Sequence, residues 1–350
     1  MAVVYVSCPN SCQLHVLRMG IDGVFDVLQI VETPGEVQPI TISHDQSFLY
    51  ATVRPEFALL SYKIESDGKL TEIGRSSMPV SASSSCIDIT GQYLLLSSYA
   101  QNALAVSHIN SHGIAQSPHQ VLEHLTKAHS VMAVADQYPI KSNSILEQQT
   151  IFCACLGDDK INLYRFNHNG YLIKGAQSKL MTKMGSGPRH MTQDASGKNI
   201  YAINELDGDV LHFVQDEKPR WQLTQTLSYM PVDFAGPFWA ADIHITKDAR
   251  FLYVSERTSS TLALFSIDSL SGELTLIELL DTELAPRGFA LSPDNIWLVC
   301  AGQHSNHVAS YQVDNESGKL TIAHRHSVGD EPMWVRIITR EGLSSKSVCV

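Results

Sequence analysis

Short apolar runs separated by polar turn formers recur along the whole chain. Residues 3–6, 48–51 and 251–254 are examples, each made of four mostly aromatic or branched residues. Runs of this length and composition, bounded by polar residues, are typical of β-strands. No segment shows helical spacing of apolar residues over three or more turns with capping residues at its ends. The pattern therefore predicts an all-β chain.

Turns made of a polar residue followed by glycine return at a regular interval. Gly23, Gly68 and Gly113 lie 45 residues apart, and Gly272 and Gly318 lie 46 residues apart. A second set of polar turns precedes the aromatic runs, so each period contains two hairpins and four antiparallel strands. A four-stranded unit of about 45 residues is typical of a β-propeller blade. The 350 residues accommodate seven such blades.

The repeat also predicts how the ring closes. We expect residues 1–338 to form a single seven-bladed domain and residues 339–350 to form a C-terminal tail. The seventh blade is split, because the run at 333–338 has no partner nearby and the chain starts with the second strand of a blade at 3–7. Joining the two runs leaves no exposed sheet edge. Residues 137–149 interrupt one hairpin and are predicted to be a surface insertion.

Composition and charge exclude several classes of protein. The chain has 25 Lys and Arg against 36 Asp and Glu, a formal net charge of −11, and no basic run that would bind nucleic acid. Its seven cysteines include no C-x-x-C pair, so neither a disulfide framework nor a zinc knuckle is indicated. The chain start resembles no export signal, and no apolar stretch reaches membrane-spanning length. We expect a cytoplasmic protein that binds neither nucleic acid nor a membrane.

Topology predicts where the chemistry lies. In a four-stranded blade, the start of the innermost strand and the end of the second strand share one face of the ring. Polar and aromatic side chains gather in the loops of this face, as is usual for a ligand site on a rigid scaffold. Four arginines among them indicate an anionic ligand, since guanidinium groups bind phosphate and carboxylate. The candidate substrate-binding residues are Arg54, Tyr99, His190, Trp239, His244, His304 and Trp334, and the candidate catalytic residues are His129, Arg189, Glu205, Arg257 and Arg287.

These residues also have structural interpretations. Arg189 and Arg287 could pair with acidic groups between blades, and Trp239 and Trp334 could be core residues. A metal site from His129, His190 and His244 would need all three imidazoles at one point, and nothing in their spacing requires it. We therefore predict no metal and no organic cofactor.

Motifs in every blade resemble those of the bacterial propeller-type 6-phosphogluconolactonases. The resemblance covers about residues 2–338 and rests on segments that include Gly187-Pro-Arg-His-Met191, Trp239-Ala-Ala-Asp-Ile-His-Ile245, Pro286-Arg-Gly-Phe289 and Pro332-Met-Trp-Val335. It implies hydrolysis of 6-phospho-D-glucono-1,5-lactone to 6-phospho-D-gluconate, a step of the pentose phosphate pathway, without a cofactor. Similarity in fold to a fungal muconate-lactonising enzyme implies a site made of His129, Arg189 and Glu205 with either Arg257 or Arg287.

The chemistry of lactone hydrolysis fits these residue types. Glu205 or His129 could act as the general base on water, an arginine could stabilise the oxyanion, and other arginines could hold the phosphate. The chain contains no Gly-x-Ser-x-Gly segment, so a serine acyl-enzyme is not expected. A muconate-type lactonising cycloisomerase and a non-catalytic interaction propeller are the alternatives. The sequence leaves the oligomeric state open, a monomer included.

Overall fold

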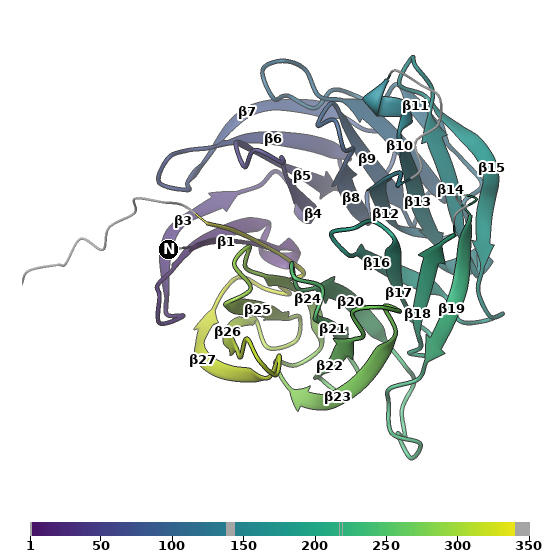
Figure 1. Ribbon diagram of the computed structural model, residues 1–350. Coiled ribbons are helices and arrows are strands. Elements are labelled where there is room, and N and C mark those ends of the chain that lie inside the picture. The colour runs from purple at the N-terminus through teal and green to yellow at the C-terminus, as the bar shows by residue number, and fades with distance from the viewer. Residues whose placement is uncertain (1, 138–143, 217, 219, 340–350) are drawn as a thin grey trace, which may run out of the picture.

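Seven sheets of four antiparallel strands stand around a common axis. The computed structural model describes residues 2–137, 144–216, 218 and 220–339. Within these residues the chain forms 28 strands, and in each sheet one strand lies near the axis and one at the rim (Figure 1). The predicted all-β fold with seven four-stranded blades is confirmed.

From the axis outward, the blades contain β28 (Trp334–Thr339), β1 (Ala2–Cys8), β2 (Gln13–Met19) and β3 (Phe25–Glu32); β4 (Glu36–Ile42), β5 (Phe48–Arg54), β6 (Ala58–Ile64) and β7 (Leu70–Ser77); β8 (Ser84–Ile87), β9 (Tyr93–Ser98), β10 (Ala103–His108) and β11 (Gln120–Leu122); and β12 (Ala128–Ala135), β13 (Gln149–Cys155), β14 (Lys160–Phe166) and β15 (Leu172–Met181). The remaining three contain β16 (Pro188–Gln193), β17 (Asn199–Asn204), β18 (Val210–Gln215) and β19 (Trp221–Leu227); β20 (Ala240–Ile245), β21 (Phe251–Glu256), β22 (Thr261–Ile267) and β23 (Leu274–Asp281); and β24 (Pro286–Leu291), β25 (Trp297–Gly302), β26 (His307–Val313) and β27 (Leu320–Ser327). Short 3-10 helices are η1 (Pro9–Ser11), η2 (Ile145–Glu147) and η3 (Leu156–Asp158).

The first and last described strands close the ring. Strand β28 pairs antiparallel with β1, with Val335 opposite Val6 and Ile338 opposite Val3. The backbone N–H of Trp334 also donates to Oγ of Ser7 at 3.2 Å. This confirms the predicted closure and gives β1 a neighbour on both sides.

The core lies between the facing surfaces of neighbouring blades, and the repeated glycine turns take part in it. The hydroxyl of Tyr50 in β5 donates at 3.1 Å to the carbonyl of Gly113 in the next blade. Tyr201 makes the equivalent bond to Gly272 at 2.7 Å. These glycines have φ of +76°, a backbone conformation that glycine adopts without strain. Each bond ties a buried second strand to the outer turn of the following blade.

The innermost strands carry irregularities near their first residues. Register shifts occur between Ala128 and Ser130, between Pro188 and Met191, and between Ala240 and Ile243. Similar shifts occur in β4 and β24. Bulges of this kind redirect side chains and are frequent beside active sites. All five bulges lie on the face that the sequence singled out.

The predicted insertion lies between β12 and β13, where η2 occupies part of it. Its residues 138–143 and the predicted tail after residue 339 lie outside the described residues. In the described part of the chain, no helix has the length and apolarity needed to cross a membrane.

Candidate active site

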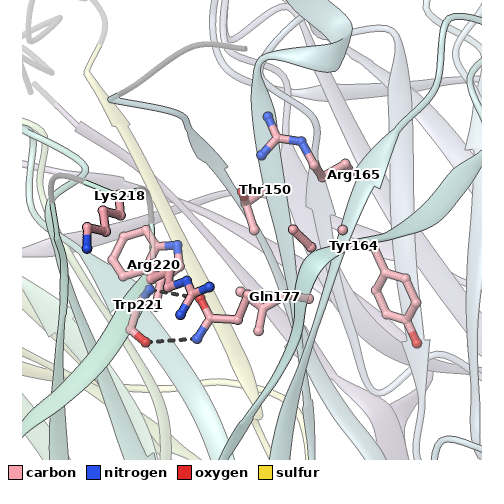
Figure 2. A pocket seen from close by; sticks show the side chains of 10 residues that line it. Thr150, Tyr164, Arg165, Gln177, Lys218, Arg220 and Trp221 are labelled. Carbon is pink, nitrogen blue, oxygen red and sulfur yellow. Dashed lines mark hydrogen bonds between the residues drawn. The ribbon is translucent and has the colours of Figure 1, made fainter.

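The largest cavity is on the outer rim and does not collect the predicted residues. It has a volume of about 680 Å³ and lies between two neighbouring blades, beside Arg165, Gln177 and Trp221 (Figure 2). Arg165 is already paired there with Asp136. We therefore look for the site at the ring axis.

A smaller polar cavity at the axis brings most of the candidates together. It has a volume of about 210 Å³ and opens on the face where the innermost strands begin. Its lining consists of Gln38, Arg54, Ser81, Ala82, Ser83, Tyr99, Ala100, His129, Arg189, Glu205, Arg257 and Arg287. All five predicted catalytic residues are among them, supplied by four different blades.

Arg189 and Glu205 form an ion pair at the base of this cavity. Arg189 lies in the bulge of β16, and Glu205 follows β17, so the hairpin brings both to the same end of the blade. Nε of Arg189 donates to Oε2 of Glu205 at 2.7 Å. The guanidinium also donates to the carbonyl of Ala241. The side chain of Arg189 is only 2% exposed, and this burial lowers the pKa of its guanidinium.

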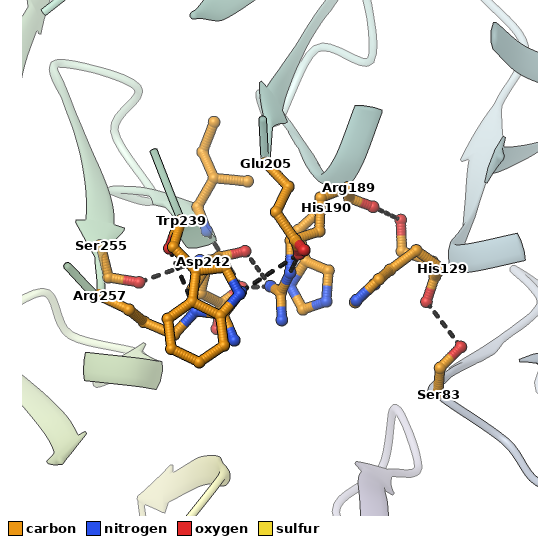
Figure 3. Close-up of polar contacts among 12 residues, drawn as sticks. Ser83, His129, Arg189, His190, Glu205, Trp239, Asp242, Ser255 and Arg257 are labelled. Atoms are coloured by element: carbon orange, nitrogen blue, oxygen red, sulfur yellow. Dashed lines mark hydrogen bonds and ion pairs between the residues drawn. The ribbon is translucent and has the colours of Figure 1, made fainter. Parts of the chain in front are cut away.

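Arg257 is the second guanidinium on the same carboxylate. Its Nη2 lies 3.2 Å from Oε2 of Glu205, and its Nε donates to the carbonyl of Trp239 at 3.1 Å. The guanidinium stacks 3.8 Å from the centre of the Trp239 ring, which is 37% exposed at the rim of the cavity (Figure 3). Burial, followed by the charge of Arg189, lowers the pKa of Arg257.

Arg287 is a half-buried cation without a partner. It lies in the bulge of β24, lines the cavity, and makes no hydrogen bond or ion pair with the described residues. Burial and the charge of Arg189 lower its pKa as well. Arg54, by contrast, is exposed at the cavity edge and paired with Glu36 at 2.5 Å.

The cavity therefore has a surplus of positive charge. Arg189, Arg257 and Arg287 face a single carboxylate, Glu205. Buried charges that lack a counterion are unfavourable, and an anionic ligand would offset this cost. The arrangement is suited to binding a phosphate or carboxylate and to stabilising an oxyanion.

His129 lies in the bulge of β12, across the cavity from Glu205 (Figure 3). Its carbonyl accepts hydrogen bonds from Ser83 and Ser97, both at 3.0 Å, and these bonds hold the strand end in place. Its ring has no hydrogen-bond partner among the described residues. Burial, followed by the charge of Arg189, holds the pKa of His129 well below 6.5. The imidazole is therefore neutral at pH 7 and able to accept a proton.

Two further predicted histidines share one carboxylate behind the cavity. Nδ1 of His190 lies 2.7 Å from Oδ1 of Asp242, and Nε2 of His244 lies 3.1 Å from Oδ2. The rings of His190 and His129 are in contact, with 5.2 Å between their centres. His190 thus supports the cavity wall, whereas His244 lies farther along β20 and lines a different cavity.

The other candidates lie at varying distances from the cavity. Tyr99 lines it, with its ring 5.9 Å from that of His129. Trp334 is buried in the core beside His190, with ring centres 5.4 Å apart. His304 is an exposed turn residue after β25 on the same face and is not part of the lining.

Sequence reasoning missed Gln38, Ser81, Ser83 and Asp242. Gln38 and Asp242 occur in segments that were recognised, but nothing in those segments showed that a bulge places them near the axis. Ser81 and Ser83 precede a strand and have no signature of their own. Among the described residues, no three or more His, Cys, Asp or Glu side chains are arranged to hold a metal ion.

Comparisons with known proteins agree with this geometry. The chain is 39% identical to 6-phosphogluconolactonase of Serratia proteamaculans, over 97% of this chain and 99% of that protein. It is also 39% identical to the 6-phosphogluconolactonase of Yersinia enterocolitica, over 96% of this chain and 98% of that protein. The solved structure of a periplasmic gluconolactonase from Pseudomonas aeruginosa has the same fold, with a TM-score of 0.85, 24% identity, and 97% and 100% of the two chains covered. The family described as lactonase, 7-bladed β-propeller, matches residues 3–337. The chain therefore belongs to the seven-bladed β-propeller lactonase family.

Proposed function

We propose that this protein hydrolyses 6-phospho-D-glucono-1,5-lactone to 6-phospho-D-gluconate. The observation that carries the proposal is the unpaired guanidinium of Arg287 beside the Arg189–Glu205–Arg257 cluster. A phosphorylated lactone supplies both groups that such a cavity requires, a dianion to bind and a carbonyl oxygen that becomes negative. The relatives named 6-phosphogluconolactonase support the same substrate. Because that substrate is a soluble metabolite of the pentose phosphate pathway, we also propose a cytoplasmic location.

Each residue has a role that follows from its contacts. Arg287 binds the phosphate, because its guanidinium is free. Arg257 and Arg189 stabilise the oxygen of the lactone carbonyl as water attacks the carbon. Glu205 holds both of these guanidiniums through Oε2, and its main role is to orient them.

His129 is the general base in this scheme. Its neutral ring takes a proton from the attacking water and returns it to the ring oxygen of the lactone as the tetrahedral intermediate collapses. The products are a hydroxyl group and a carboxylic acid, which ionises at neutral pH. One proton is therefore released to solvent for each lactone opened.

The experiment measures proton release from freshly prepared 6-phosphogluconolactone above the spontaneous rate. The protein should accelerate the reaction, and Arg287→Met should raise KM at least about tenfold because a charge-assisted contact to phosphate is lost. Arg75→Met serves as the matched control, since Arg75 is exposed at the rim and already paired with Glu72. Absence of acceleration would refute the proposal. Equal use of unphosphorylated gluconolactone would refute the phosphate role of Arg287.

A further inference from the structure

A second polar cavity lies at the opposite end of the ring axis. It has a volume of about 390 Å³ and is lined by the last residues of β20 and β24, the turns that follow them, and β28. The innermost strands begin at the candidate active site and end at the opposite face (Figure 1). The two cavities are therefore about one strand length apart, roughly 15–20 Å. They share no lining residue.

Arg336 is the central cation of this second cavity. Its side chain is half-buried and lies 5.0 Å from the centre of the Trp334 ring. Nη1 donates to the carbonyl of Val335 at 2.9 Å, and no carboxylate of the described residues forms an ion pair with the guanidinium. Burial lowers the pKa of Arg336, an effect that the distant charge of Asp242 only partly offsets. The guanidinium is held in place but not neutralised.

Two more basic groups line the same cavity. Lys247 follows β20, and its backbone N–H donates at 2.9 Å to the side-chain oxygen of Asn295 from the neighbouring blade. No ion pair of the Lys247 ammonium occurs in the described part of the chain. His244 presents a half-buried ring that packs against Phe289, with ring centres 4.8 Å apart. Three blades thus contribute to one basic concavity of an acidic protein.

The nearby acidic groups are occupied by other partners. Asp242 binds His190 and His244, Asp248 is paired with Arg250 at 2.8 Å, and Asp294 accepts the hydroxyl of Ser292 at 2.5 Å. No Asp or Glu lines the cavity. The positive charge at this opening is therefore not balanced locally, as it would be in a purely structural ion network.

We propose that this cavity is a second binding site, specific for a small phosphorylated or polycarboxylate metabolite. Arg336 would bind two oxygens of the anion through its planar guanidinium, and Lys247 and His244 would contact the remaining oxygens. The apolar walls formed by Leu291, Pro293 and Ile337 would accommodate the carbon skeleton of such a metabolite. The site is independent of the lactone-binding cavity and does not depend on the proposed reaction.

Isothermal titration calorimetry with inorganic phosphate tests this site. The wild-type protein should bind two equivalents, one at each cavity. Arg336→Met should weaken one of them at least about tenfold, and Arg287→Met should weaken the other, because each removes a charged donor. Arg250→Met is the matched control, since Arg250 lies on the same face as Arg336 but is paired with Asp248. It should behave as the wild type.

Two further measurements keep the outcome clear. Arg336→Lys retains the charge and should bind several-fold more weakly than the wild type even if the Met variant fails to fold. Crystals of the wild-type protein soaked in tungstate, a phosphate mimic, should show an anomalous peak beside Arg336. The proposal is overturned if a folded Arg336→Met variant still binds two equivalents, or if no tungstate occupies this cavity. Loss of binding only in Arg287→Met would overturn it as well, whereas loss only in Arg336→Met would count against the phosphate role of Arg287.

Discussion

The position of Glu205 distinguishes orientation from base catalysis. One of its oxygens, Oε2, accepts hydrogen bonds from both Arg189 and Arg257. A carboxylate bound in this way keeps two guanidiniums at a fixed separation, and pre-organised donors account for much of the stabilisation of an oxyanion. His129, in contrast, has a ring without partners among the described residues and a pKa well below 6.5.

This difference predicts opposite kinetic effects for two substitutions. His129→Gln removes the proposed base, and kcat should fall by about two orders of magnitude or more. Glu205→Gln keeps the shape and one oxygen acceptor, so it should mainly raise KM and lower kcat less than about tenfold. Steady-state kinetics of both variants would check this. A larger loss of kcat in Glu205→Gln than in His129→Gln would identify Glu205 as the base.

Arg189 offers a second measurement at the same scale. Arg189→Lys retains the charge but cannot bond Glu205 and the carbonyl of Ala241 at the same time. We expect kcat/KM to fall at least about tenfold while the circular dichroism spectrum stays unchanged. Near-normal kcat/KM in this variant would show that the pair is only structural.

At the level of elements, β28 is the strand on which ring closure depends. Val335 is 1% exposed and packs in a cluster with Val4, Val6 and Val299. An aspartate there would be an unpaired buried charge on the strand that joins the two ends of the ring.

Val335→Asp should therefore lower the apparent unfolding temperature by roughly 10 °C, since such buried charges cost several kcal/mol. Differential scanning calorimetry would measure the change. Thr321→Asp, on an exposed position of the rim strand β27, provides the control and should have little effect. Equal unfolding temperatures for the two variants would contradict the importance of the closing strand.

The sequence was a good guide to the elements because each blade repeats the same two turns. The glycine interval reflects a real contact, the bond from a buried tyrosine to the next blade's glycine turn. The site was less predictable, because bulges interrupt the alternation of side chains at the start of the innermost strands. Asp242 illustrates the limit: its partner His190 comes from the neighbouring blade, 52 residues earlier, and local pattern carries no trace of that contact.

For the whole molecule, buried histidines make stability depend on pH. Burial, followed by the charge of Arg189, lowers the pKa of His190 to about 4, and burial lowers that of His212 to about 4 as well. An unfolded histidine has a pKa near 6.5, so between pH 6.5 and 4 the unfolded chain binds more protons than the native protein. The free energy of unfolding must therefore fall as the pH falls through this window.

Urea denaturation at pH 7, 6 and 5 would measure this slope. Each buried neutral histidine should contribute about 1.4 kcal/mol per pH unit below pH 6.5. His190→Asn should be less stable at pH 7 but should show a shallower loss on acidification. Asp242 does not obscure the result: although burial opposes ionisation, His244 and His190 hold the pKa of Asp242 well below its usual range. An unfolding free energy that is constant from pH 7 to 5 would contradict the assignment of neutral buried histidines.

The pairing of β1 with β28 has a consequence for biosynthesis. A ribosome adding about 5–20 residues per second needs roughly 15–70 s to proceed from the first strand to its partner. Throughout this time β1, which is apolar and fully buried in the finished ring, can pair only with β2. Nascent chains that stop before Trp334 would keep that edge exposed, so premature termination should yield aggregation-prone products however many complete blades they contain.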